Sequence, residues 1–241
     1  MSYPERIVPA RTSPGIVALH LKRYDFARQL CESAEVLDGG CGVGYGTAHL
    51  AETARRVVGL DRSAEAIAEA RREYARPNVE FVQGDLLALP FDAHSFDVVC
   101  AFEAIEHLDD PERFLREAAR VLRANGMLIV STPHVARTNL ESANPFHRVE
   151  LSAADLESLL QERFALVEMY GQRRVQTRRH RVAQRLDVLG LRRRMPVLRP
   201  LSRALGTAAT VDVGLDDIEI SRDRIGNASE LVAVCARPLP Q

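Results

Sequence analysis

The feature that most constrains the fold is a regular alternation of strand-like and helix-like segments along most of the 241 residues. Short apolar runs rich in β-branched residues are typical of buried strands, and apolar residues three or four positions apart are typical of helices. The alternation predicts an α/β fold, a doubly wound and mostly parallel sheet with helices on both faces. Seven strands are expected, at 35–38, 56–61, 79–82, 96–101, 126–131, 164–170 and 231–235, and helices at 16–31, 63–74, 111–122 and 152–161. A turn at Asn125-Gly126 is expected before the fifth strand.

The composition argues against several classes of protein. With 46% apolar and 27% charged residues, the chain resembles an ordinary globular protein rather than a disordered one. No apolar run approaches the roughly 18–20 residues of a membrane-spanning helix, and no secretory signal is visible. The cysteines lack the spacing of a zinc site or of a disulfide framework, so we expect small buried side chains and a cytoplasmic location. These cysteines are Cys31, Cys41, Cys100 and Cys235.

A net charge of −1 conceals a strong segregation of charge along the sequence. Residues 1–170 carry 18 basic and 26 acidic side chains, a net of −8, whereas residues 171–204 carry 11 arginines and one acid, a net of +10. The remaining residues, 205–241, have a net charge of −3. We therefore expect a catalytic domain at 1–171 plus 231–241, interrupted at 172–230 by an arginine-rich helical insertion before the last strand.

The insertion has several interpretations. Its arginines, which are densest at 172–204, could form a solvated helix that faces the domain's own acids, or a lid docked over the substrate. An amphipathic helix of this kind would associate weakly with a membrane surface. Nucleic acid is not an expected partner, because aromatic side chains are not interleaved with the arginines.

A glycine-rich segment follows the first expected strand and reads DGGCGVG at 38–44. Its glycines allow a tight turn and a close approach of a ligand to the main chain, but the spacing differs from the G-x-G-x-x-G of dinucleotide sites. Asp38 precedes the turn, Asp61 ends the second strand and Asp85 follows the third. Since ligands bind at the carboxyl ends of parallel strands, these acids predict a ligand with a cationic head, a ribose and an exocyclic amine.

Four segments together carry a resemblance to a known family. The runs VLDGGCGVGYG, VVGLDRS, FVQGDLLALPF and FDVVCAFEAIEHLDDP resemble the ordered motifs of class I S-adenosylmethionine-dependent methyltransferases. The resemblance covers roughly residues 16–170 and the last strand. It implies a Rossmann-like sheet with a reversed final hairpin, S-adenosylmethionine as cofactor and S-adenosylhomocysteine as product. Two later segments, STPH and NPFH, look like the branch that methylates oxygen or nitrogen atoms of small molecules.

The resemblance also assigns cofactor-binding residues. The turn would lie beside the methionine part of the cofactor, Asp61 would hold the ribose, and Asp85 with the main chain of Leu86 would hold the adenine. An N-terminal helix that includes His20 resembles one that closes over the cofactor, where Arg23 or Tyr24 could meet its carboxylate. The full expected set is Arg23, Tyr24, Asp38, Gly40, Gly42, Asp61, Arg62, Asp85, Leu86 and Phe102.

Candidate catalytic residues follow the fourth and fifth strands. Histidine is the side chain best suited to accept a proton near pH 7. The candidate catalytic residues are His107, which is the favoured base, and His134 and His147, which could contact the substrate directly. Glu103 and Glu150 could bind the hydroxyls or the amine of a substrate, although acids of the loop at 103–110 would more commonly be solvated surface. No metal is expected, because no HxH or HxxxH pattern is present.

These observations predict an enzyme that transfers a methyl group from S-adenosylmethionine to a hydroxyl or amine of a small molecule. A sugar-like or other secondary metabolite, for example an amino-sugar antibiotic, is the favoured acceptor. Alternatives are O-methylation of a quinone or phenol, a non-catalytic regulatory protein that binds the same cofactor, and an NAD-binding protein.

Overall fold

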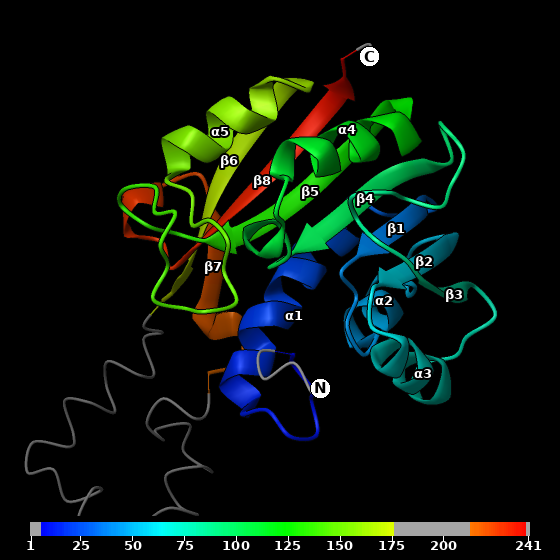
Figure 1. The fold of residues 1–241 in the computed structure, drawn as a ribbon. Coiled ribbons are helices and arrows are strands. Elements are labelled where there is room, and N and C mark those ends of the chain that lie inside the picture. Colours follow the sequence, from blue (N-terminus) through cyan, green and yellow to red (C-terminus); the bar gives the residue numbers. More distant parts are fainter. Residues whose placement is uncertain (1–5, 176–212, 240–241) are drawn as a thin grey trace, which may run out of the picture.

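The fold is built on one central sheet (Figure 1). The computed structural model describes residues 6–175 and 213–239. Eight strands lie in the order β3-β2-β1-β4-β5-β8-β6-β7. The strands are β1 (Glu35–Gly39), β2 (Arg56–Asp61), β3 (Val79–Gln83), β4 (Phe96–Phe102), β5 (Leu122–Pro133), β6 (Phe164–Arg174), β7 (Ile218–Ser221) and β8 (Glu230–Pro238). The helices are α1 (Pro14–Arg28), α2 (Tyr45–Leu50), α3 (Ala64–Glu73), α4 (Pro111–Val121) and α5 (Ala153–Gln161), with single 3₁₀ turns η1 (Ile105–His107), η3 (Leu215–Asp217) and η4 (Ile225–Asn227).

The predicted α/β class with a mostly parallel sheet is confirmed, but the predicted number of strands is wrong. The strands from β3 to β5 pair in parallel, whereas β8 is antiparallel to both β5 and β6. The additional strand is β7, which pairs antiparallel with β6 at the edge of the sheet. It has only four residues, and an ion pair of 2.8 Å joins its Glu219 to Arg173 of β6. So short a strand leaves little pattern in a sequence.

The structure also corrects the boundaries of the expected insertion. The expected boundary between 171 and 172 falls inside β6, which continues to Arg174. The segment 172–230 is not wholly helical, because β7 lies within it. The densest arginines fall at 176–212, outside the described residues, so the lid and the membrane-surface association stay predictions.

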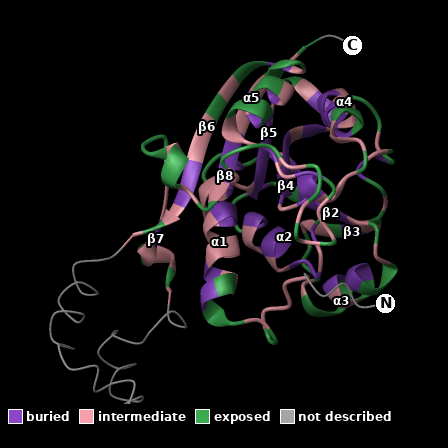
Figure 2. Cartoon of the chain, turned by 60° about the vertical axis from the view of Figure 1, so that its left-hand side comes forward, coloured by how far each residue is buried: buried purple, intermediate pink, exposed green. Residues whose placement is uncertain are grey.

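Alternate residues of each central strand face opposite layers of helices. Leu37 and Val99 belong to the core beneath α4 and α5, whereas Val36 and Val98 belong to the core beneath α1 and α2. The four side chains are between 0% and 2% exposed, as expected for a parallel sheet that is covered on both faces. Figure 1 shows α4 and α5 on one side of the sheet, and Figure 2 shows the buried residues gathered between the layers.

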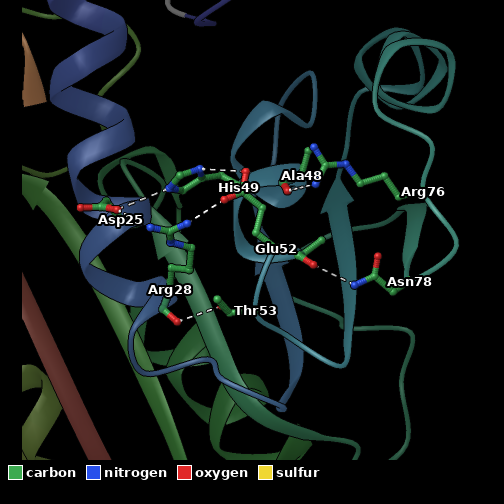
Figure 3. Close-up of polar contacts among 9 residues, drawn as sticks. Asp25, Arg28, Ala48, His49, Glu52, Thr53, Arg76 and Asn78 are labelled. Atoms are coloured by element: carbon green, nitrogen blue, oxygen red, sulfur yellow. Dashed lines mark hydrogen bonds and ion pairs between the residues drawn. The ribbon is translucent and has the colours of Figure 1, made fainter.

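A network of polar contacts fixes α1 against α2 (Figure 3). Arg28 of α1 donates to Glu52 at 2.7 Å and to Asp25 at 3.1 Å, and Asp25 also lies 3.7 Å from His49. The hydroxyl of Thr53 donates to the carbonyl oxygen of Arg28 at 3.1 Å. Exposed ion pairs add little stability individually, but together they define where the helix lies. This position matters because α1 carries side chains into the site described below.

Two smaller expectations have different outcomes. The predicted turn at Asn125-Gly126 falls inside β5, where the pairing with β4 is irregular. Phe96 pairs with Leu122 and Val98 with Met127, so four residues of β5 lie opposite one residue of β4 at this point. The four cysteines are free and buried, as predicted. Among the described residues, no helix has the length and apolar character needed to cross a membrane.

Candidate active site

A cavity of about 500 Å³ opens at the carboxyl ends of the parallel strands. It includes the point where β1 lies beside β4, which is the position where open α/β sheets bind ligands. Most of the expected site residues line it: Tyr24, Gly40, Gly42, Asp61, Arg62, Asp85, Leu86, Phe102, Glu103, His107 and His147. Its volume is within the range of small-molecule sites.

The glycine turn adopts a backbone that other residues rarely accept. Gly40 and Gly42 have φ angles of +77° and +54°, in the left-handed region. At Gly42 the main-chain N–H donates to the Asp61 carboxylate at 3.0 Å, and the second oxygen of Asp61 accepts from the Ser63 N–H at 2.8 Å. Asp61 therefore holds the turn and also starts α3, while its side chain remains at the cavity wall.

Asp85 forms a similar local turn at the end of β3. Its carboxylate accepts from the Leu87 N–H at 2.9 Å, and both Asp85 and Leu86 line the cavity. Asp61 and Asp85 thus lie at the ends of neighbouring parallel strands. A carboxylate at the end of the second strand is suited to hydrogen-bonding ribose hydroxyls.

Asp38 is placed differently from the other two acids. It is fully buried and does not line the cavity; its oxygens accept from the Thr47 hydroxyl at 2.6 Å and the Tyr24 hydroxyl at 3.3 Å. Burial raises the pKa of Asp38 to about 7, against the opposing effect of these hydrogen bonds. Asp38 acts in the structure as a support beneath the glycine turn and behind Tyr24.

The raised pKa of Asp38 predicts a pH-dependent stability. Between the ordinary value of 3.8 and about 7, the folded protein keeps a proton on Asp38 that the unfolded chain has released. The free energy of unfolding therefore falls as pH rises through this interval, by up to about 1.4 kcal/mol per pH unit. We expect the melting temperature of the wild type, relative to that of Asp38→Asn, to fall between about pH 4.5 and about pH 7.5. If the melting temperatures of the two ligand-free proteins changed with pH in parallel, the raised pKa of Asp38 would be contradicted.

Arg23 lies beside the cavity with an incomplete set of partners. Its side chain is 1% exposed, and its Nη2 is 3.8 Å from a carboxylate oxygen of Glu103. Among the described residues, its Nε and Nη1 have no hydrogen-bond partner. A buried guanidinium in this state is costly unless a ligand supplies an acceptor. Burial, and then the charge of Arg23, lowers the pKa of the cavity-lining His20 to about 3, so His20 is neutral.

The structure brings two of the three candidate histidines together. The rings of His107 and His147 lie 5.0 Å apart in an edge-to-face arrangement. Nδ1 of His147 lies 2.9 Å from the Glu150 carboxylate, which lies behind it rather than in the cavity lining. His134 is not in the cavity lining, and its Nδ1 lies 3.0 Å from the carbonyl oxygen of Ala228.

Sequence reasoning missed Glu106, which it treated as part of a solvated acidic loop. The structure places Glu106 in η1 with 1% exposure and at the cavity wall. Burial, and then the charge of Glu103, raises the pKa of Glu106 well above its ordinary value. Glu103 itself has a φ angle of +49°, which is uncommon for a residue other than glycine. The signal in the sequence that this loop turns inward is the apolar residue Ile105 next to Glu106, and the structure buries Ile105 fully.

The observed side chains fit an adenosine-containing cofactor that also carries a carboxylate. The left-handed glycines leave the main chain accessible, and two strand-end acids line the cavity. The underpartnered guanidinium of Arg23 lies behind the cavity wall, 3.8 Å from the cavity-lining Glu103. The fold and the site thus define an α/β enzyme of the class that binds such cofactors at the switch point of its sheet.

Comparisons with known proteins identify the family. Residues 37–130 match the model of a methyltransferase domain. A probable S-adenosylmethionine-dependent methyltransferase of Mycobacterium tuberculosis is 37% identical over 229 residues, covering 91% of this chain and 82% of that protein. The chain therefore belongs to the S-adenosylmethionine-dependent methyltransferases, and it is an enzyme that uses S-adenosylmethionine as cofactor.

Two further similarities concern a more distant relative and a solved structure. A phthiotriol/phenolphthiotriol dimycocerosates methyltransferase of Mycobacterium leprae is 34% identical over 156 residues, covering 63% of this chain and 55% of that protein. The 1,6-didemethyltoxoflavin-N1-methyltransferase of Burkholderia thailandensis, solved with S-adenosylhomocysteine, has a TM-score of 0.58 at 18% identity, covering 91% and 78% of the two chains. This second similarity shows a shared fold.

Proposed function

We propose that the protein methylates a hydroxyl group of a polar small molecule. When bound, S-adenosylmethionine supplies an electrophilic methyl group and leaves as S-adenosylhomocysteine. The residues that would hold it are those at the glycine turn, Asp61, Asp85 and Arg23. The observation that carries the choice of a hydroxyl is the imidazole of His147 in the cavity wall with the carboxylate of Glu150 behind it.

A hydroxyl is a weak nucleophile until it loses its proton, and an imidazole is a suitable acceptor near pH 7. Nδ1 of His147 donates to Glu150, which makes Nε2 the nitrogen with the lone pair; Nε2 lies 3.0 Å from the amide nitrogen of Asn144. The hydrogen bonds from Ser142 and His147 lower the pKa of Glu150, so its carboxylate is charged. His107 shares this part of the cavity.

Other polar side chains near this pair support a polar acceptor. Glu103, Asp109 and Asn144 line the same cavity and offer carboxylate and amide groups to a polyol or an amino sugar. A sugar-like secondary metabolite is therefore the favoured substrate class. The Mycobacterium leprae relative favours a second candidate, since its name describes methylation of phthiotriol and phenolphthiotriol dimycocerosates.

The proposal is tested by incubating the purified protein with S-adenosylmethionine and a panel of acceptors. The panel contains amino sugars, neutral glycosides, simple amines, phenols and fatty alcohols, and release of S-adenosylhomocysteine is measured. We expect turnover with the sugar-like hydroxyl acceptors. Turnover with amines, phenols or fatty alcohols alone would replace the proposed acceptor, and cofactor binding without turnover on any member would favour a regulatory role.

A further inference from the structure

Three potential metal ligands meet in the wall of the cavity. Glu106, His107 and His147 each place one ligand atom so that all three atoms lie within 4.8 Å of one another. We propose that these side chains bind a divalent transition-metal ion. The sequence gives no HxH or HxxxH pattern because His147 comes from a separate loop, and only the fold brings it beside Glu106 and His107.

Glu106 supplies the observation that points independently to a ligand. Its side chain is 1% exposed, yet among the described residues its Oε2 has no hydrogen-bond partner. A buried carboxylate oxygen without a partner is costly, and native proteins usually satisfy such an atom with a donor or a cation. Glu106 also lines the cavity, so a cation that enters from solvent can reach it.

The two histidines are held as metal-binding histidines commonly are. Nδ1 of His107 lies 3.0 Å from the carbonyl oxygen of Phe146, and Nδ1 of His147 lies 2.9 Å from the carboxylate of Glu150. In both rings this contact fixes the proton on Nδ1 and leaves the lone pair on Nε2. A carbonyl or carboxylate behind an imidazole is the usual outer-shell arrangement that orients a histidine toward a metal. A bound cation would replace the Asn144 amide as the partner of Nε2 in His147.

The ligand set favours a transition metal over magnesium. Two imidazoles and one carboxylate form the protein ligands of many catalytic zinc sites, which keep a further position for water or substrate. Magnesium prefers oxygen ligands. At metal–ligand distances of about 2.0–2.2 Å, tetrahedral ligands lie about 3.4 Å apart, so donor atoms that now lie within 4.8 Å of one another must approach by up to about 1.4 Å. Side-chain rotation supplies such a shift.

The position of this group indicates what the metal would do. Asp61 and Asp85 follow β2 and β3, whereas Glu106 and His107 follow β4 on the other side of β1. The cation would thus lie at the acceptor end of the cavity, away from the expected nucleoside end. There it would bind the acceptor oxygen and lower the pKa of its hydroxyl. Because Nε2 of His147 would then be a metal ligand, the proton would leave to solvent or to Glu103 rather than to His147. This role rests on the proposed hydroxyl acceptor, but the binding of the metal does not.

The first test measures binding without any acceptor. The full-length protein is dialysed against a chelator and titrated with Zn²⁺ and, separately, Mg²⁺ by calorimetry; Co²⁺ serves as an optical probe. We expect one equivalent of Zn²⁺ with a micromolar or lower Kd, and absorption bands of Co²⁺ with nitrogen ligands. No saturable Zn²⁺ binding, or tighter binding of Mg²⁺, would overturn the proposal.

Variants identify the ligands. Losing an outer-shell partner of a metal ligand weakens metal binding by about 10- to 100-fold. Losing a ligand itself should have a larger effect, which we expect for each of the variants Glu106→Gln, His107→Gln and His147→Gln. Binding of S-adenosylhomocysteine by each variant shows that it is folded. The control is His94→Gln, because His94 contacts the Leu122 carbonyl and does not line the cavity. Undiminished Zn²⁺ binding by all three folded variants would overturn the site.

Turnover separates this inference from the proposed function. The protein could bind no Zn²⁺ and still methylate a hydroxyl acceptor at a rate that a chelator does not lower. That result would overturn the metal site and leave the proposed function intact. Stoichiometric Zn²⁺ binding that the three variants abolish supports the metal site even when no hydroxyl acceptor is methylated. Loss of turnover on chelation, restored by Zn²⁺ or Co²⁺, supports both.

Discussion

Replacing Arg23 by methionine is expected to weaken binding of S-adenosylhomocysteine by about 10- to 100-fold with little loss of stability. Methionine fills a similar apolar volume but removes the guanidinium, two of whose nitrogens have no partner among the described residues. A hydrogen bond to a charged group contributes about 1.5–3 kcal/mol, which corresponds to this loss of affinity. The substitution also breaks the 3.8 Å ion pair with Glu103, but the Glu103 side chain is 20% exposed, so water can solvate its carboxylate and the loss of stability should be small. The Kd is measured by calorimetry and the melting temperature by circular dichroism.

A matched control is available one residue earlier on the same helix. Lys22→Met also removes one positive charge, but Lys22 is half-buried and does not line the cavity. Its Kd for S-adenosylhomocysteine should stay within about twofold of the wild-type value. An Arg23→Met protein that binds the product as tightly as the Lys22→Met protein would show that Arg23 does not contact the cofactor.

Replacing Gly46 by alanine is expected to lower the free energy of unfolding by about 3 kcal/mol, at the upper end of the effect of overpacking. A Cβ atom at Gly46 would lie 2.0 Å from the ring of Tyr24. That ring is confined by Phe102 at 4.9 Å and is hydrogen-bonded to Asp38 at 3.3 Å, so it has little room to move. At about 2–4 °C per kcal/mol for a chain of this size, the melting temperature should fall by about 6–12 °C.

Alanine is a better helix former than glycine, so a fall in stability at Gly46 isolates the steric effect. Gly226→Ala is the control, since nothing lies within 4 Å of its added Cβ. A second check removes the ring of Tyr24. In a Tyr24→Ala background, Gly46→Ala should lower the free energy of unfolding much less than it does in the wild type. Equal costs in the two backgrounds would mean that Tyr24 does not limit the space at Gly46.

The parts of the molecule that local sequence determines were predictable. The glycine turn, Asp61 and Asp85 follow strands with strong apolar patterns, so their positions at the strand ends are set within a few residues. The edge strand β7 was not predictable, because its four residues are too few to show a period and its pairing partner lies more than forty positions earlier.

The acceptor side of the cavity depends on contacts between distant segments. Nothing in the local sequence distinguishes His107 and His147 from His134 as candidates for this part of the cavity. In the structure the rings of His107 and His147 lie together, whereas His134 contacts the carbonyl oxygen of Ala228. Glu106 is in a run of charged residues typical of surface, and only the packing of η1 against the core buries it. Composition and periodicity do not contain these long-range contacts.

The position of β8 between β5 and β6 has a consequence for synthesis on the ribosome. Leu128 of β5 pairs with Cys235 of β8, so the edge of β5 has no strand to pair with until the chain has emerged through β8. The five parallel strands can form early, but β6 and β7 cannot join the sheet until β8 is present. An unpaired strand edge is prone to aggregation, so nascent chains of this protein are expected to need chaperones until β8 has been synthesised.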